Sequence, residues 1–209
     1  MKLNERGLLV VLSGPSGVGK GTVRKALFEL EGHDLVYSIS MTTRPPRDGE
    51  VDGIDYYFVD KATFEAKIEN DELLEWAQFV GHYYGTPLDK VEAQLKQGKE
   101  VVLEIEVQGA LQVREKMSDA VFVFISPPNK EALYRRLLRR GTESTETIKK
   151  RMDKAEREFP LAHKYDYIVV NDEVTNAADR ILAIIRAEHA KTERSIHKYN
   201  EMLEVNKDG

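Results

Sequence analysis

A short run of small residues ending in a lysine carries the first recognisable chemistry in this chain. It is the sequence GPSGVGKGT, which contains the pattern G-x-x-x-x-G-K. Glycines let the backbone turn tightly with its N–H groups pointing inward, and the lysine that follows can reach phosphate oxygens. The pattern predicts a nucleotide phosphate loop made of Gly14, Pro15, Ser16, Gly17, Val18, Gly19, Lys20, Gly21 and Thr22. A chance string is the alternative, and a strand before the loop with a helix after it disfavours chance.

One position of this loop departs from the usual pattern. Ser or Thr normally follows the lysine and helps to hold Mg²⁺, but Gly21 stands there. Thr22 is the next residue, and we expect its hydroxyl to take that role, either directly or through a water molecule. The loop is therefore predicted to bind phosphate with a displaced hydroxyl.

A second candidate anion site lies in a proline-rich turn. Arg44 and Arg47 flank two prolines, and pairs of tyrosines follow at 56–57 and 83–84. Proline restricts the backbone, so the two guanidinium groups are held near each other at a low entropic cost. Arginine forks and tyrosine hydroxyls together suit a phosphate group. The alternative is a solvated basic turn whose tyrosines pack a small core.

Composition limits the classes of protein to be considered. The chain has 209 residues, 41% of them hydrophobic and 32% charged, which is typical of a globular protein. It contains no cysteine, which excludes disulfides and thiol catalysis and fits a cytoplasmic location. Its formal net charge of -5 disfavours nucleic acid as a partner. The apolar run at residues 8–12 is too short to span a membrane, and we expect no signal peptide.

The elements that must position these residues alternate along the chain. Strands are expected at residues 7–13, 101–107, 121–125 and 167–170. Helices are expected at residues 20–30, 87–97, 108–117, 129–140, 145–158 and 175–200. Alternating strands and helices predict the α/β class, with a parallel sheet covered by helices.

Two segments interrupt this alternation. Residues 38–86 combine short strand-like pieces with one helix-like piece at 61–70, which predicts an inserted mixed α+β lobe. Residues 129–158 form a basic helical hairpin, which predicts a movable lid. The remaining segments, 1–37, 87–128 and 159–209, are predicted to form one discontinuous core.

Several motifs in this order resemble the guanylate kinase family, whose members transfer the γ-phosphoryl group of ATP to GMP. Besides the glycine loop they are TTRPPRDGEVDGIDYYF, LLEWAQFVGHYYGTP, LEIEVQGA, RRGTES with IKKRM, and VVND. The resemblance extends from about residue 7 to about residue 188 and implies a P-loop core with a GMP-binding lobe and a helical lid. It also implies Mg²⁺ as the cofactor that accompanies ATP.

The resemblance implies a role for particular residues. The expected GMP-binding residues are Ser40, Arg44, Arg47, Tyr56, Glu75, Tyr84, Thr86 and Glu106. The expected ATP-binding residues outside the loop are Arg136, Arg140, Asn171 and Asp172. The expected catalytic residues are Lys20, Arg44, Arg136, Arg140 and Arg151. Thr22 and Glu104 are expected on the metal side, although the division of roles between Glu104 and Glu106 stays open at this point.

The chemistry of the bases agrees with this assignment. Guanine presents adjacent N1–H and N2–H₂ donors that one carboxylate accepts, whereas adenine has no such pair and would leave Glu75 unpaired. Two alternatives stay open: another nucleoside-monophosphate kinase, and a non-catalytic module that binds partner peptides. The expected partners are ATP and GMP, with no nucleic acid and no membrane, and the chain is expected to be a monomer or a homodimer.

Overall fold

The centre of the molecule is a parallel sheet. The structure is a computed structural model that describes residues 6–139 and 145–204. Five strands lie in the order β2-β7-β1-β8-β9, and all neighbouring pairs are parallel. They are β1 (Leu9–Ser13), β2 (Leu35–Tyr37), β7 (Glu100–Glu104), β8 (Val121–Ser126) and β9 (Tyr167–Val170). The predicted parallel α/β core is confirmed.

Helices cover both faces of this sheet because successive strand residues point to opposite sides. In β1, Val10 and Leu12 pack with one group of helices, and Leu9 and Val11 pack with another. The first face is covered by α1 (Lys20–Glu29) and α7 (Val174–His189), and the second by α3 (Leu88–Lys96) and α4 (Val107–Lys116). Both faces of β1 are buried, so its carboxyl end and the loop after it have a rigid base.

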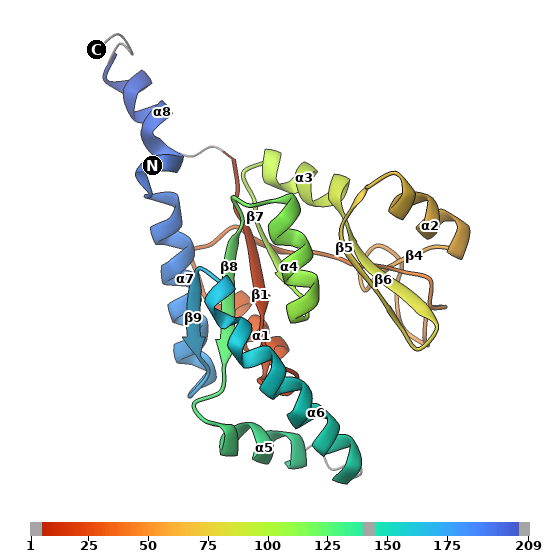
Figure 1. Ribbon diagram of the computed structural model, residues 1–209. Coiled ribbons are helices and arrows are strands. Elements are labelled where there is room, and N and C mark those ends of the chain that lie inside the picture. The colour runs from red at the N-terminus through yellow and green to blue at the C-terminus, as the bar shows by residue number, and fades with distance from the viewer. Residues whose placement is uncertain (1–5, 140–144, 205–209) are drawn as a thin grey trace.

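A second, smaller sheet forms within residues 38–87. Its strand order is β4-β3-β6-β5, and a short helix packs beside it. The elements are β3 (Met41–Thr42), β4 (Tyr57–Phe58), α2 (Lys61–Glu69), β5 (Leu73–Phe79) and β6 (His82–Pro87). Phe64, Met41 and Leu73 form a core that is separate from those of the main sheet. Figure 1 shows this lobe to one side of the main sheet.

The helical hairpin has its own small core. It consists of α5 (Lys130–Arg139) and α6 (Thr145–Glu158), followed by the 3₁₀ helix η1 (Phe159–Lys164). Leu133 and Leu137 pack against Ile148 and Ala155. In Figure 1 the pair lies at the end of the molecule opposite the last helix, α8 (Thr192–Met202).

Some expected boundaries are wrong. The strand expected at 101–107 ends at Glu104, because Val107, Ala110 and Val113 form the buried face of α4 instead. The helix expected at 175–200 is two helices, since Lys191 has an extended backbone (φ -58°, ψ 133°) between them. These errors arise because alternating and helical patterns overlap in short apolar runs.

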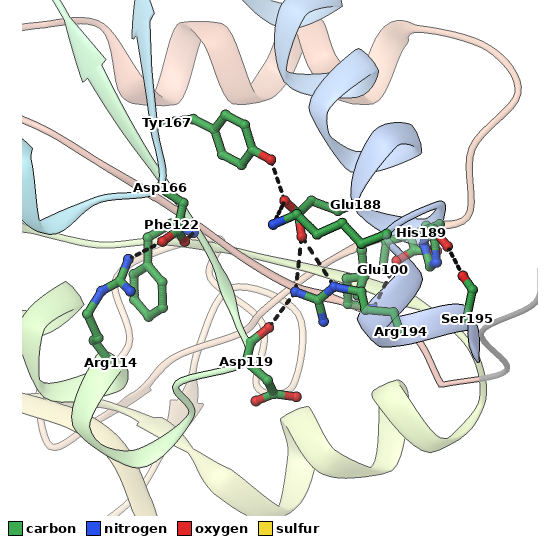
Figure 2. Close-up of polar contacts among 12 residues, drawn as sticks. Glu100, Arg114, Asp119, Phe122, Asp166, Tyr167, Glu188, His189, Arg194 and Ser195 are labelled. Carbon is green, nitrogen blue, oxygen red and sulfur yellow. Dashed lines mark hydrogen bonds and ion pairs between the residues drawn. The ribbon is translucent and has the colours of Figure 1, made fainter. Parts of the chain in front are cut away.

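A network of polar side chains lies away from the glycine loop, where α7 and α8 meet the ends of β7 and β9 (Figure 2). Glu188 is only 1% exposed, and its carboxylate accepts hydrogen bonds from Tyr167 and Arg194. It also pairs with Lys191, with 2.6 Å between Nζ and Oε1. Burial by itself raises the pKa of Glu188, but the hydrogen bonds of Lys191, Tyr167 and Arg194 outweigh it and hold the pKa below its usual value. The network therefore ties α7 and α8 to the sheet.

Candidate active site

The glycine loop joins the carboxyl end of β1 to α1. Gly14 and Gly19 have φ values of +146° and +94°, which residues with a side chain rarely adopt. A Cβ atom on Gly14 would lie 2.2 Å from the carbonyl oxygen of Ile125, and one on Gly19 would lie 2.8 Å from Nδ2 of Asn171. The loop therefore needs glycine both for its backbone conformation and for its close packing against β8 and the end of β9.

Lys20 is the first residue of α1, and its side chain folds back over the loop. Its Nζ donates hydrogen bonds to the carbonyl oxygens of Gly14 (2.7 Å) and Pro15 (3.2 Å). Burial lowers the pKa of Lys20, while the carboxylates of Glu104 and Glu106 act in the opposite direction. The hydrogen bonds to two neutral carbonyls hold the ammonium group against the loop that is predicted to bind phosphate.

A cavity of about 500 Å³ opens beside this loop. It is lined by Ser16, Gly17, Gly19, Lys20, Gly21, Thr22, Lys25, Glu104, Ile105, Glu106 and Arg151. Thr22 and Glu104, the two residues expected on the metal side, thus share one cavity with the lysine. The N–H groups at the amino end of α1 add a positive potential to the same space.

The position of the missing hydroxyl is next to a carboxylate. A Cβ atom on Gly21 would lie 3.4 Å from Oε1 of Glu104. The other oxygen, Oε2, accepts a hydrogen bond from Nε of Arg24 at 2.9 Å. Arg24 in turn lies 4.3 Å from the centre of the Tyr37 ring. Arg24, which no sequence motif marked, therefore holds Glu104 beside the space where other phosphate loops carry their hydroxyl.

Arginines from the helical hairpin reach the glycine loop. Arg136 on α5 donates to the carbonyl oxygens of Val18 (3.0 Å) and Asn171 (2.7 Å). Arg151 on α6 donates to Oγ of Ser16 from Nη2 (2.9 Å) and Nε (3.2 Å). Two of the three expected lid arginines are therefore beside the loop.

The other predicted ATP-side residues differ in their positions. Arg140 lies outside the described residues. Asn171 is buried, and its Nδ2 donates to the carbonyl oxygen of Val18 at 2.8 Å, so it helps to shape the loop. Asp172 is exposed and pairs with Arg180 at 3.3 Å. The N–H of Glu173 is the main reason why the pKa of Asp172 lies below its usual value.

A second cavity of about 420 Å³ lies between the small sheet and α4. The predicted GMP-binding residues that line it are Ser40, Tyr56, Glu75, Tyr84 and Glu106. Residues 104–106 line both cavities, so the two cavities adjoin at this segment.

A buried carboxylate lies in the second cavity. Glu75 on β5 is 8% exposed, and Oγ1 of the buried Thr86 donates to its Oε1 at 2.6 Å. Burial raises the pKa of Glu75, and the bond from Thr86 partly opposes that change. A Cβ atom on Gly109 would lie 3.0 Å from Oε2 of Glu75, so α4 approaches the carboxylate closely. The group is fixed in place and has spare capacity to accept hydrogen bonds.

The proline-rich turn is organised by a glutamate. Oε1 of Glu50 accepts from Nη2 of Arg44 at 2.8 Å, and Oε2 accepts from the backbone N–H of Arg47 at 2.7 Å. The N–H of Arg47 and then the guanidinium of Arg44 hold the pKa of Glu50 below its usual value despite partial burial. Arg44 also lies 5.4 Å from the ring centre of Tyr56, which lines the second cavity. Arg47 is exposed.

Comparison with known proteins decides the family. A model of the guanylate kinase family matches residues 6–188 of the chain. The chain belongs to the guanylate kinase family. It is 65% identical over 207 residues to the guanylate kinase of Onion yellows phytoplasma (strain OY-M), covering 99% of this chain and 98% of that protein. It is 54% identical over 203 residues to the guanylate kinase of Bacillus subtilis (strain 168), covering 97% of this chain and 100% of that protein.

Solved structures agree with this assignment. The crystal structure of guanylate kinase from Anaplasma phagocytophilum matches with a TM-score of 0.74 and 36% sequence identity, covering 97% of this chain and 96% of the other. The predictions of a kinase and of a P-loop α/β fold are therefore confirmed. Within the described ranges, no helix of this guanylate kinase family member has the length and apolar character needed to cross a bilayer.

The roles of the individual residues stay predictions, although the structure places most of them together. Thr86 donates a hydrogen bond to Glu75. Arg44 lies over the ring of Tyr56, which lines the second cavity. The charged residues at the site that were not predicted include Arg24, Glu50 and Lys154, whose Nζ donates to Oε2 of Glu106 at 2.7 Å. The only sequence signal for Glu50 was its place in the turn, three residues after Arg47, whereas Arg24 and Lys154 resemble ordinary surface residues of charged helices.

Proposed function

We propose that this member of the guanylate kinase family transfers the γ-phosphoryl group of ATP to GMP, giving ADP and GDP in the cytoplasm. The observation that supports it best is a pair of cavities that adjoin at residues 104–106, with Lys20 lining one of them and Glu75 lining the other. ATP would occupy the glycine-loop cavity, and GMP the cavity of the small sheet.

The reaction needs positioning more than proton transfer. An oxygen of the ionised GMP phosphate attacks the γ-phosphorus, and the bond from that phosphorus to the oxygen bridging the β- and γ-phosphates breaks as ADP leaves. The nucleophile has no proton to remove, so no general base is required. Catalysis then rests on alignment and on neutralising the negative charge that develops, which Lys20, Arg44, Arg136 and Arg151 are proposed to do. Arg140 keeps the same proposed role from outside the described residues.

Guanine selectivity is proposed to come from Glu75. A carboxylate accepts the N1–H and N2–H₂ groups of guanine together, and Thr86 holds one of its oxygens in place. Ser40 and Glu106 line the same cavity and are proposed to contact the base as well. Arg44, Arg47, Tyr56 and Tyr84 are proposed to hold the GMP phosphate.

The proposed cofactor is Mg²⁺ bound together with the ATP phosphates. Among the described residues, no group of three or more His, Cys, Asp or Glu side chains is arranged to hold a metal ion. Magnesium that bridges phosphates needs only one or two protein oxygens, and Thr22 and Glu104 share the cavity of Lys20, so the residues present fit this ion. Bound there, Mg²⁺ would neutralise charge on the β- and γ-phosphates. Because Arg24 donates a hydrogen bond to Oε2 of Glu104, Oε1 is the oxygen that would face Mg²⁺.

The first prediction tests the proposed reaction. Purified full-length protein is given ATP and Mg²⁺ with GMP, AMP, CMP or UMP, and ADP formation is measured. GMP should be the preferred acceptor, and Lys20→Met should fold normally while losing about 100-fold or more in kcat. Lys150→Met is the control, since Lys150 pairs within α6 with Glu146 and should leave turnover unchanged. Preference for another acceptor, or full activity of Lys20→Met, would contradict the proposal.

A further inference from the structure

One face of α6 contacts both sides of the site. Arg151 and Lys154 are three residues apart, so they lie on the same side of the helix. Arg151 reaches Ser16 in the glycine loop, while Nζ of Lys154 reaches Oε2 of Glu106 at 2.7 Å. A single helix of the hairpin is therefore linked to the donor side by one cation and to the acceptor side by another.

Glu106 lies where a contact with the hairpin can affect nucleotide binding. It precedes the first turn of α4, it lines both cavities, and it is 69% exposed. The bond from Lys154 uses one carboxylate oxygen, so the other is available to a nucleotide base. Lys154 also lies 3.9 Å from Glu158, a buried carboxylate on the next turn of α6. The ammonium group thus stands between two carboxylates, one on the hairpin and one at the acceptor cavity.

We propose that Lys154 couples the position of the helical hairpin to binding of the acceptor nucleotide, through its ion pair with Glu106. The inference rests on the proposed function, and it makes Lys154 a positioning residue and not a catalytic one. When the hairpin is closed, Lys154 holds Glu106 in a single orientation for the base. Binding of the acceptor excludes water from the ion pair between Lys154 and Glu106. This strengthens the ion pair, because such pairs are stronger where the dielectric constant is low.

The coupling is expected to be reciprocal and modest. Binding of the donor closes the hairpin and improves acceptor affinity, and by linkage the acceptor improves donor affinity by the same factor. An exposed ion pair contributes up to about fivefold to an equilibrium constant. Loss of Lys154 should therefore weaken the coupling several-fold without preventing either nucleotide from binding alone.

Calorimetry measures this directly without turnover. GMP is titrated into the full-length protein with and without a saturating non-hydrolysable ATP analogue and Mg²⁺. In the wild type the analogue should lower the Kd for GMP. The ratio of the Kd values without and with the analogue should be about three- to fivefold smaller in Lys154→Met than in the wild type. Lys154→Arg should keep most of it, and Lys150→Met, on the same helix, should keep all of it. Equal coupling in the wild type and Lys154→Met, or none in the wild type, would overturn the inference.

The same series separates this inference from the proposed function. If the wild-type protein uses a different acceptor, the proposed function fails, and the titrations with the accepted nucleotide still decide the role of Lys154. Glu106→Gln should reduce the coupling as much as Lys154→Met, and the double variant should lose no more than either single one. Additive losses would mean that the two residues act independently and would overturn the inference.

A distance measurement supplies a readout that does not depend on nucleotide affinity. The chain has no cysteine, so spin labels placed by Ala62→Cys on α2 and Lys149→Cys on α6 have no competing site. Both positions are exposed. In the nucleotide-free protein, Lys154→Met should broaden the distribution of distances between the two labels and extend it to longer values. Lys150→Met should leave the distribution unchanged. Identical distributions with and without Lys154 would contradict the proposed link.

Discussion

At the scale of single residues, Glu75 shows how burial adapts a common side chain to one task. A glutamate on a surface is ionised and surrounded by water, but Glu75 is 8% exposed and its pKa is raised by that burial. Only the ionised form can accept both donors of guanine. Burial therefore disfavours the ionised form, and at a pH below the raised pKa the proposed contact with guanine requires Glu75 to lose a proton.

The raised pKa of Glu75 predicts proton release on binding. At mildly acidic pH, GMP binding should release a proton, and GMP affinity should fall as the pH falls through the raised pKa. Calorimetry in two buffers of different ionisation enthalpy measures the released proton. Glu75→Gln should abolish this part of the release while retaining that of the nucleotide phosphate. Identical proton release in both proteins would contradict the assignment of Glu75 as the group that contacts guanine.

At the scale of elements, the turn between β3 and β4 is held in shape by its own carboxylate. Glu50 accepts hydrogen bonds from the side chain of Arg44 and from the backbone N–H of Arg47. These bonds hold the backbone of the turn and the guanidinium group of Arg44 in place, which would reduce the entropy lost when a phosphate binds. Two prolines in the same turn act in the same direction.

Removing this internal support should weaken acceptor binding. Glu50→Ala is expected to raise the KM for GMP about tenfold, the effect of losing a charge-assisted hydrogen bond, with little change in the KM for ATP. Asp48→Ala, in the same exposed turn, is the matched control and should leave both values unchanged. Equal effects of the two substitutions on the KM for GMP would show that Glu50 has no special role.

At the scale of the whole molecule, the proposed active site and the polar network around Glu188 lie at different ends of the sheet. The glycine loop and the hairpin lie at the carboxyl ends of the strands, while the network around Glu188 lies where α7 and α8 join the sheet (Figure 2). The depressed pKa of Glu188 means that its stabilising contribution is complete above the ordinary carboxyl pKa. That contribution is lost as the pH falls through the depressed folded-state value.

This network predicts an effect on stability alone. Glu188→Gln should lower the free energy of unfolding at neutral pH by about 2 kcal/mol, since it leaves Lys191 and Arg194 without their counter-charge. The difference in the free energy of unfolding between the wild type and Glu188→Gln should shrink as the pH falls below about 4. The KM values for ATP and GMP should not change. Chemical denaturation across that pH range measures it, with the exposed Glu193→Gln as control. A loss independent of pH would contradict the role given to the ionised carboxylate.

Much of the fold follows from local patterns along the chain. The buried run before Gly14 predicts β1, and the glycine spacing predicts the loop after it, because both depend on neighbours in sequence. The two helices at 175–200 were not separated in the sequence analysis, and the break between them lies at Lys191, where Lys191 and Arg194 both pair with the buried Glu188. Local periodicity contains no information about such contacts.

Spacing and motifs along the chain were sufficient to predict the phosphate loop and the parallel core, whereas the roles of the acceptor residues stay predictions. Only the tertiary structure decided which charges meet. Arg24 and Glu104 are separated by 80 residues, and Lys154 and Glu106 by 48, yet both pairs are in contact at the site. Such pairs form only when distant strand ends and helices converge on one edge of the sheet.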